Sequence, residues 1–157
     1  MKFTDLETLS LYIIDKQNKN DLEFIKKLFH DENIKKWVNG ISNILSENIN
    51  KDFFGSGFIV KLNDEYIGYV GIGSFNEKER CVYLRAGISN DKTGLGYGKR
   101  ILSEITNYIF SNYDMVENIK LKINKENIPS LRTANSCGYI WLNDDFYIKY
   151  NPYIKRI

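Results

Sequence analysis

The sequence predicts an α/β (α+β) fold in which a mixed, mostly antiparallel sheet is flanked by helices. The period of its apolar residues switches between the helical 3.6 and the strand value of 2 several times along 157 residues. Three apolar runs follow one another in the middle of the chain, separated only by short polar stretches, which favours antiparallel neighbours. A strand, a glycine-rich loop, a helix and another strand then fill residues 82–123, as in one parallel crossover.

The first third of the chain is expected to hold one strand and two helices. Leu9–Ile14 is rich in β-branched and aromatic residues, which favour a strand. Two groups of apolar residues at helical spacing follow it: Leu22, Ile25, Leu28 and Phe29, and then Ile34, Trp37, Val38, Ile41, Ile44 and Leu45. We expect Asn20 or Asp21 to cap the first of these helices and Asp31 to cap the second.

The centre of the chain is expected to form three strands. They are the apolar runs Phe58–Leu62, Tyr66–Ile72 and Cys81–Ile88. Their polar separators, NDE and NEKER, are typical of turns, so consecutive antiparallel pairing is the simplest arrangement.

The last third alternates helices and strands. Ile101, Leu102, Ile105, Tyr108 and Ile109 lie on one face of an expected helix. Asn118–Ile123 alternates like a strand. A helix with Pro129 in its first turn ends at Gly138, and two strands close the chain around Asn143-Asp144-Asp145. The expected order is β-α-α-β-β-β-α-β-α-β-β, and the length favours one domain over residues 1–157.

Composition excludes several classes of function. The 22 basic and 20 acidic residues leave a formal net charge of +2, too balanced for a protein whose main partner is nucleic acid. No apolar run approaches the roughly 18 residues of a membrane span. Asp5 and Glu7 stand where a signal peptide needs apolar residues, so we expect a cytoplasmic protein. Cys81 and Cys137 fit no metal site and are expected to be buried hydrophobic residues.

The stretch KTGLGYGKR, residues 92–100, is the densest glycine run in the chain. It fails as a nucleotide P-loop, because Thr93 stands at the first glycine position and Arg100 replaces the magnesium-binding Ser or Thr. It fails as a Rossmann fingerprint, because Gly94, Gly96 and Gly98 are separated by single residues. A helix start near Gly98 would still present backbone amides to an anion, and Lys99 would add positive charge. A diphosphate held without a metal fits this loop.

Thr93–Gly98 resembles the loop of the GNAT superfamily of acetyl-CoA-dependent N-acetyltransferases, whose pattern is Gln/Arg-x-x-Gly-x-Gly/Ala. Gly96 and Gly98 occupy the two glycine positions, and Thr93 replaces the usual Gln or Arg. About thirty residues later comes a segment similar to the second motif of the family, with four matching positions: Asn127, Ser130, Gly138 and Tyr139. The predicted order of elements resembles the family fold. The opening helices resemble the branch that contains ribosomal-protein N-terminal acetyltransferases.

The resemblance implies acetyl-CoA as the acetyl donor, bound without a metal. The residues expected to cradle its diphosphate are Thr93, Gly94, Leu95, Gly96, Tyr97, Gly98, Lys99 and Arg100. The family splays the strand before the loop away from the next strand, so that pantetheine pairs with its backbone. That strand end is Gly87, Ile88 and Ser89 here. Asn127 is expected to hold pantetheine or a water.

The resemblance also implies direct attack of an amine on the thioester, without a covalent enzyme intermediate. Two catalytic residues usual in the family are missing. The strand Cys81–Arg85 lacks a glutamate base, and Glu77 and Glu79, just before it, are expected to be solvated turn charges. Ala134 stands where many relatives carry a tyrosine acid. Ser130 takes its place as the candidate donor of a proton to the leaving thiolate, with Asn127 beside it.

The acceptor stays open at this point. It is expected to be a primary amine, either a protein or peptide N-terminus or a small amine such as a polyamine or an antibiotic. A non-catalytic acyl-CoA-binding module is the alternative, favoured by the two missing catalytic residues. The tyrosine-rich last strand is a candidate homodimer edge, and neither nucleic acid nor membrane is expected as a partner.

Overall fold

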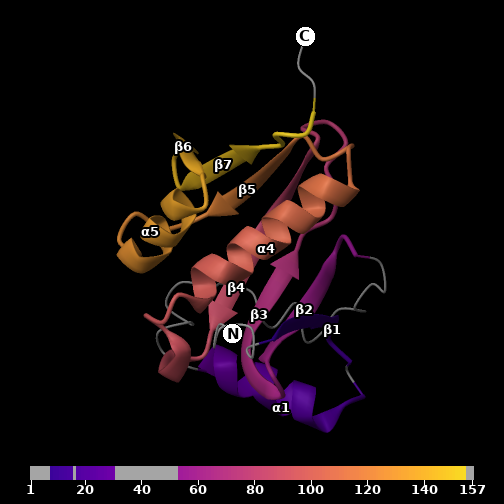
Figure 1. The fold of residues 1–157 in the computed structure, drawn as a ribbon, viewed down its shortest axis with the longest axis vertical. Helices are drawn as coiled ribbons and strands as arrows, with labels where there is room; N and C mark the ends of the chain where they lie inside the picture. The colour runs from indigo at the N-terminus through magenta and orange to yellow at the C-terminus, as the bar shows by residue number, and fades with distance from the viewer. Residues whose placement is uncertain (1–7, 16, 31–52, 155–157) are drawn as a thin grey trace, which may run out of the picture.

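The computed structural model of this protein describes residues 8–15, 17–30 and 53–154. In these ranges, seven strands form one sheet in the order β1-β2-β3-β4-β5-β7-β6 (Figure 1). The strands are β1 (Leu9–Ile13), β2 (Ser56–Leu62), β3 (Glu65–Ile72), β4 (Cys81–Ile88), β5 (Asn118–Lys122), β6 (Ile140–Asn143) and β7 (Phe146–Tyr150). The helices are α1 (Lys19–His30), α4 (Tyr97–Asn112), α5 (Ile128–Ser136) and the short 3₁₀ helix η2 (Asn90–Lys92).

The predicted order of elements is confirmed wherever the structure describes the chain. The consecutive strands β2, β3 and β4 pair antiparallel, and β4 pairs parallel with β5 across the α4 crossover. The second predicted helix, with apolar residues at Ile34–Leu45, lies outside the described residues. No helix in the described ranges is long and apolar enough to cross a bilayer.

Helix α4 lies diagonally across one face of the sheet (Figure 1). Its apolar side is buried in the same core as alternate residues of the parallel pair. These buried residues are Ile101, Leu102, Ile105 and Ile109 of α4, Val82 and Leu84 of β4, and Ile119 and Leu121 of β5. Because strand side chains alternate, Tyr83 and Lys120 point to the opposite face.

Helix α1 covers part of that opposite face. Its buried Ile25 and Phe29 pack with Ile59 of β2 and Tyr69 of β3, whose ring meets that of Phe29 edge-on at 5.2 Å. The burial raises the pKa of Tyr69 to about 12, against an opposing effect of the Arg85 charge. This second core ties α1 to β2 and β3.

The cap of α1 differs from the expectation. The side-chain oxygen of Asn18 accepts the backbone amides of Asn20 and Asp21 at 2.9 and 3.2 Å, so Asn18 caps the helix. Asp21 is instead buried, and its carboxylate accepts hydrogen bonds from the hydroxyls of Tyr66 (2.7 Å) and Tyr12 (3.1 Å). A buried carboxylate needs such donors, and only the folded chain brings these tyrosines to it.

The ends of α5 match the sequence signals. Asn127 is the N-cap, Pro129 lies in the first turn, and Gly138 follows the helix at a φ of +87°. Cys81 and Cys137 are both buried free thiols, as expected.

Candidate functional site

The parallel pair of β4 and β5 opens at one end. Pairing runs from Cys81 opposite Asn118 to Leu84 opposite Leu121 and then stops. Strand β4 continues to Ile88, still paired with β3. Within the described ranges, the β5 side of residues 85–88 therefore has no partner strand.

Two hydrogen bonds decide which backbone groups face this opening. The carbonyl of Tyr83 accepts from the Gly73 amide at 2.8 Å, and the Ser89 amide donates to the Ile67 carbonyl at 2.8 Å. Both bonds point toward β3. Backbone groups alternate between the two edges of a strand, so Gly87 also faces β3. The N–H and C=O groups of Ala86 and Ile88 face the other way, into the opening.

The glycine-rich loop lies at the same end of β4. Gly94 and Gly96 have φ values of +76° and +86°, which disfavour other residues. A Cβ at either position would meet no atom within 4 Å, so the space over both glycines is open. Gly96 is the N-cap of α4 and makes no side-chain cap bond. The first turn of α4 therefore presents amides and the positive end of the helix dipole to this space.

Gly98 is where three elements meet. A Cβ built on it would lie 3.3 Å from Cδ1 of Ile88 in β4 and 4.0 Å from the side chain of Thr133 in α5. The loop, the open strand end and α5 are thus brought together, as the two sequence motifs implied. Two residues that the sequence did not single out also lie here: Thr133 of α5, beside Gly98, and Ala86, whose backbone faces the opening. The period-2 alternation of β4 was the signal available for Ala86.

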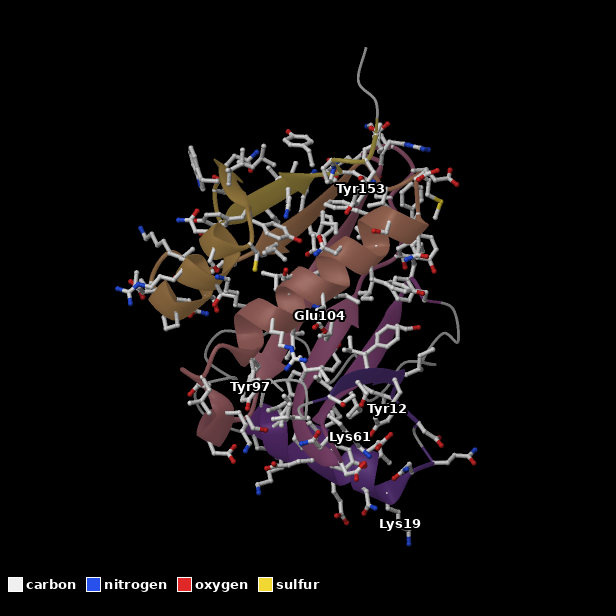
Figure 2. The ribbon with its side chains drawn as sticks, in the orientation of Figure 1. Tyr12, Lys19, Lys61, Tyr97, Glu104 and Tyr153 are labelled. Carbon is white, nitrogen blue, oxygen red and sulfur yellow. The ribbon has the colours of Figure 1, made fainter. Side chains whose placement is uncertain are left out.

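The positively charged side chains of the loop differ in their ion-pair partners. Lys92 forms an ion pair with Glu65 of β3 at 3.3 Å, and Arg100 pairs with Glu104 one turn further along α4 at 3.4 Å. Figure 2 labels Tyr97 and Glu104 on this helix. Lys99 and Thr93 are exposed, as is Leu95 at 62%. The backbone amides of the loop are thus accompanied by one exposed lysine.

Asn127 and Ser130 lie together at the N-terminus of α5, and both are half-buried. The Asn127 side-chain oxygen accepts the Ser130 backbone amide at 3.4 Å. This bond is a normal capping interaction. Tyr139, the last residue of the second motif, is buried, and its hydroxyl lies 2.7 Å from that of Thr106 in α4. It joins β6 to α4 and is no part of the opening.

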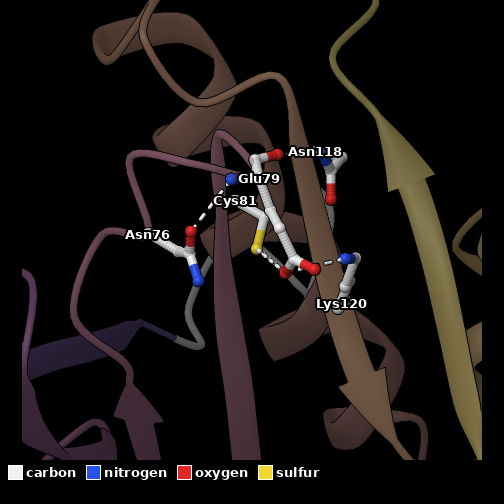
Figure 3. A network of polar contacts seen from close by, with 5 residues as sticks. All are labelled: Asn76, Glu79, Cys81, Asn118 and Lys120. Carbon is white, nitrogen blue, oxygen red and sulfur yellow. Dashed lines mark hydrogen bonds and ion pairs between the residues drawn. The ribbon is translucent and has the colours of Figure 1, made fainter.

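The turn before β4 carries a polar network (Figure 3). Glu79 accepts a hydrogen bond from Lys120 of β5 at 3.2 Å and lies 3.6 Å from the Cys81 thiol. The Lys120 hydrogen bond lowers the pKa of Glu79. Glu79 is exposed and lies in the turn before β4, as expected, and the parallel register that brings Lys120 beside Tyr83 adds an ion pair to it. Burial raises the pKa of Cys81.

A parallel strand pair that parts beside a glycine-rich helix start is the arrangement of an acetyl-CoA-dependent N-acetyltransferase. The chain belongs to the GNAT acetyltransferase family: the family model described as "Acetyltransferase (GNAT) domain" matches residues 1–140. A comparison with curated proteins by sequence gives no match.

Solved structures with the same fold include several acetyltransferases. A spermidine N-acetyltransferase from Vibrio cholerae, in complex with CoA and spermine, superposes with a TM-score of 0.73 at 18% identity, covering 91% of this chain and 95% of that one. An aminoglycoside acetyltransferase, AAC(6')-Ib, with coenzyme A gives 0.71 at 14% identity over 91% and 95%. The ribosomal-protein alpha-N-acetyltransferase RimL, with coenzyme A, gives 0.73 at 13% over 91% and 94%. At these identities the likeness shows the fold.

Proposed function

We propose that this protein transfers the acetyl group of acetyl-CoA to a primary amine by direct attack within a ternary complex. The observation that carries this proposal is the parting of β4 from β5 after Leu84 and Leu121, next to the open space above Gly94 and Gly96. One end of the coenzyme needs an anion cradle, and the rest needs an extended edge. Among the described residues, the open space above the loop glycines and the edge of β4 without a partner strand lie at the same end of that strand, which supports the binding of both parts.

The residues present suit the two parts of acetyl-CoA. The amides around Gly94–Lys99 and the positive end of α4 suit its diphosphate. The backbone of Ala86 and Ile88 suits the amides of pantetheine, because each strand residue facing the opening offers one donor and one acceptor. Gly87 and Ser89 would support this edge through their bonds to β3. Acetyl-CoA supplies the acetyl group as a thioester.

The amine would approach from the face of the sheet away from α4. Helix α4 fills the other face, where Val82, Leu84, Ile119 and Leu121 are buried. The available face carries Tyr83 and Arg85, both exposed, next to Lys120. The reaction forms an N–C bond and breaks the C–S bond. The amine gives up a proton to water. We propose that the Ser130 hydroxyl donates a proton to the departing thiolate and regains one from water, so that the serine ends unchanged, with Asn127 fixing the turn that holds it.

The acceptor class remains a choice between a protein or peptide N-terminus and a small amine. The structural neighbours include enzymes named for spermidine, aminoglycosides and a ribosomal protein, so the fold serves both kinds. The branch resemblance of the opening helices favours the N-terminus. We also propose a homodimer in the cytoplasm. The last strand, β7, was expected at a dimer edge, but it lies inside the sheet between β5 and β6 because both neighbours pair with it. The edge strand at this side is β6, and it exposes Ile140 and Trp141, which supports association of two copies.

One observation favours the alternative of a non-catalytic acyl-CoA-binding module. Strand β4 has no carboxylate between Cys81 and Ile88, and the nearest one, Glu79, is held by Lys120. Both readings require coenzyme binding. They differ only in whether an amine accelerates the release of free thiol.

The test has two stages. Calorimetric titration with acetyl-CoA, and with ATP–magnesium and NAD as controls, should show saturable binding of acetyl-CoA alone. Thiol release is then followed with a peptide library of free N-termini, spermidine and an aminoglycoside. Amine-dependent release establishes the enzyme. Binding without release for every amine favours the module, and no acetyl-CoA binding rejects both.

A further inference from the structure

Gly68 lies in β3 directly beside the open end of β4. It pairs with Ile88, and its neighbour Tyr69 pairs with Gly87. On its other side, Val60 pairs with Gly68 and Lys61 with Tyr66, which leaves Ile67 as the extra residue of a β-bulge. The Ile67 carbonyl then accepts the Ser89 amide at 2.8 Å. This part of β3 thus holds the last three residues before the loop.

The absence of a side chain at Gly68 is required by the approach of β4. A Cβ on Gly68 would lie 2.6 Å from the carbonyl oxygen of Gly87 and 3.6 Å from Cα of Ile88. Real Cβ atoms essentially never come closer than 3.0 Å. The obstacle is backbone, so no rotamer change relieves it. Gly68 is not among the glycines with positive φ, so the close approach and not the local conformation demands glycine here.

A larger residue would have one direction in which to push β4. Strand β3 is fixed on its other edge by pairing with β2. Among the residues that the structure describes, no strand pairs with residues 87 and 88 on the β5 side, so they would move toward the opening. That movement would displace the backbone groups of Ala86 and Ile88, which face the same opening.

We propose that Gly68 is a positioning residue for coenzyme binding: by letting β4 lie close to β3, it sets the place of the strand edge that pairs with the pantetheine arm. The proposal rests on the proposed function, since it assumes that pantetheine occupies the opening. The proposal makes different predictions for the two parts of coenzyme A. The diphosphate end binds at the loop, which Gly68 does not touch, and the pantetheine arm binds at the edge that Gly68 positions.

The experiment measures two ligands on Gly68→Ala. Coenzyme A contains both parts, and 3′-phosphoadenosine 5′-diphosphate contains only the loop-binding part. We expect Gly68→Ala to bind coenzyme A about tenfold more weakly, because it loses one or two amide hydrogen bonds to the pantetheine arm. We expect it to bind 3′-phosphoadenosine 5′-diphosphate as the wild type does. In the acetyl-transfer assay, the KM for acetyl-CoA should rise more than kcat falls. A general loss of stability would not separate the two ligands in this way.

Gly71→Ala is the matched control. Gly71 lies in the same strand, and its added Cβ would be 2.5 Å from the Tyr69 hydroxyl oxygen, the end of a buried side chain, whereas the Cβ at Gly68 meets backbone. The strain falls on a side chain of the α1 core instead of the β4 edge. Gly71→Ala should lower the melting temperature and leave the ratio of the two affinities unchanged.

The outcomes are distinguishable from failure of the proposed function. If the wild type binds no coenzyme A, the proposed function fails first. If the wild type binds it and Gly68→Ala binds it equally well, the assignment of Gly68 is wrong. The same holds if both ligands weaken together. If Gly68→Ala does not fold even with saturating diphosphate to stabilise it, glycine is needed for the sheet itself and the assignment is overturned.

Discussion

Lys120 and Glu79, which are 41 positions apart in the chain, form an ion pair of 3.2 Å across the start of the parallel strands β4 and β5. The pair closes the polar network shown in Figure 3 at the end of β4 opposite the glycine-rich loop. Asn118, which lies in β5 like Lys120, donates a hydrogen bond from its side-chain amide to the backbone carbonyl of Glu79 at 3.2 Å. This bond holds the turn against β5. The network therefore holds together the end at which the two strands stay paired.

This ion pair should make stability depend on pH at both extremes. The pKa of Glu79 is lowered from 4.5, so its contribution is present above that value and is lost as the pH falls through the folded-state pKa. The pKa of Lys120 is raised from 10.5: burial is the largest single effect and opposes the shift, but the Glu79 hydrogen bond and the charges of Cys81, Tyr83 and Glu79 together outweigh it. Its contribution is lost as the pH rises above 10.5. The melting temperature of Glu79→Gln should fall below wild type at pH 7 and converge with it in acid. Glu77→Gln, in the same turn, should match wild type throughout.

The buried hydroxyls of Thr106 and Tyr139, 2.7 Å apart, should be coupled. Tyr139→Phe leaves the Thr106 hydroxyl without this partner and should cost about 1–3 kcal/mol in urea unfolding. Thr106→Val should cost a similar amount, and the double variant less than the sum of the two. Strict additivity in this cycle would show that the hydrogen bond contributes nothing. Burial raises the pKa of Tyr139, so its hydroxyl stays protonated at neutral pH and keeps this hydrogen bond.

Gly96→Ala should weaken acetyl-CoA binding through the backbone. An alanine at a φ of +86° costs about 1–2 kcal/mol, and relief of that strain would turn the loop amides away from the diphosphate. Gly55→Ala offers a matched control, because Gly55 has a φ of +84° and precedes β2, away from the loop. Calorimetry should show weaker binding for Gly96→Ala alone. Equal affinities in both variants would remove the loop from the coenzyme site.

Variants of Asn127 and Ser130 should distinguish a role in capping α5 from a role in catalysis. Asn127→Ala removes the helix cap and should lower stability by about 1 kcal/mol, whereas Asn127→Asp keeps a capping oxygen, removes the amide donor and adds a negative charge. Ser130→Ala leaves the Asn127 cap in place, because the bond uses the Ser130 backbone amide. With an identified amine, we expect Ser130→Ala to reduce kcat without lowering the melting temperature. An unchanged kcat would exclude Ser130 as the acid.

Much of the fold follows from local patterns in the sequence. The strands at Cys81–Ile88 and Asn118–Lys122, and the helix between them, match the expected ranges closely because their apolar periodicity is strong. Glycine, proline and asparagine at the ends of α5 signalled its limits. The cap of α1 was misplaced because Asn18, Asn20 and Asp21 are all good capping residues, and long-range tyrosine contacts took Asp21.

The order of elements, the glycine loop and the second motif can be predicted from the amino-acid sequence, because each of these depends on residues near one another in the chain. The folded sheet was needed to show where β4 parts from β5, which residues of β4 face the opening, and that Glu79 contacts Lys120. It also shows that Gly68 must lack a side chain, since Gly87 approaches from a different strand. Such features depend on register between strands, and register is fixed by the packing of the whole sheet against its helices.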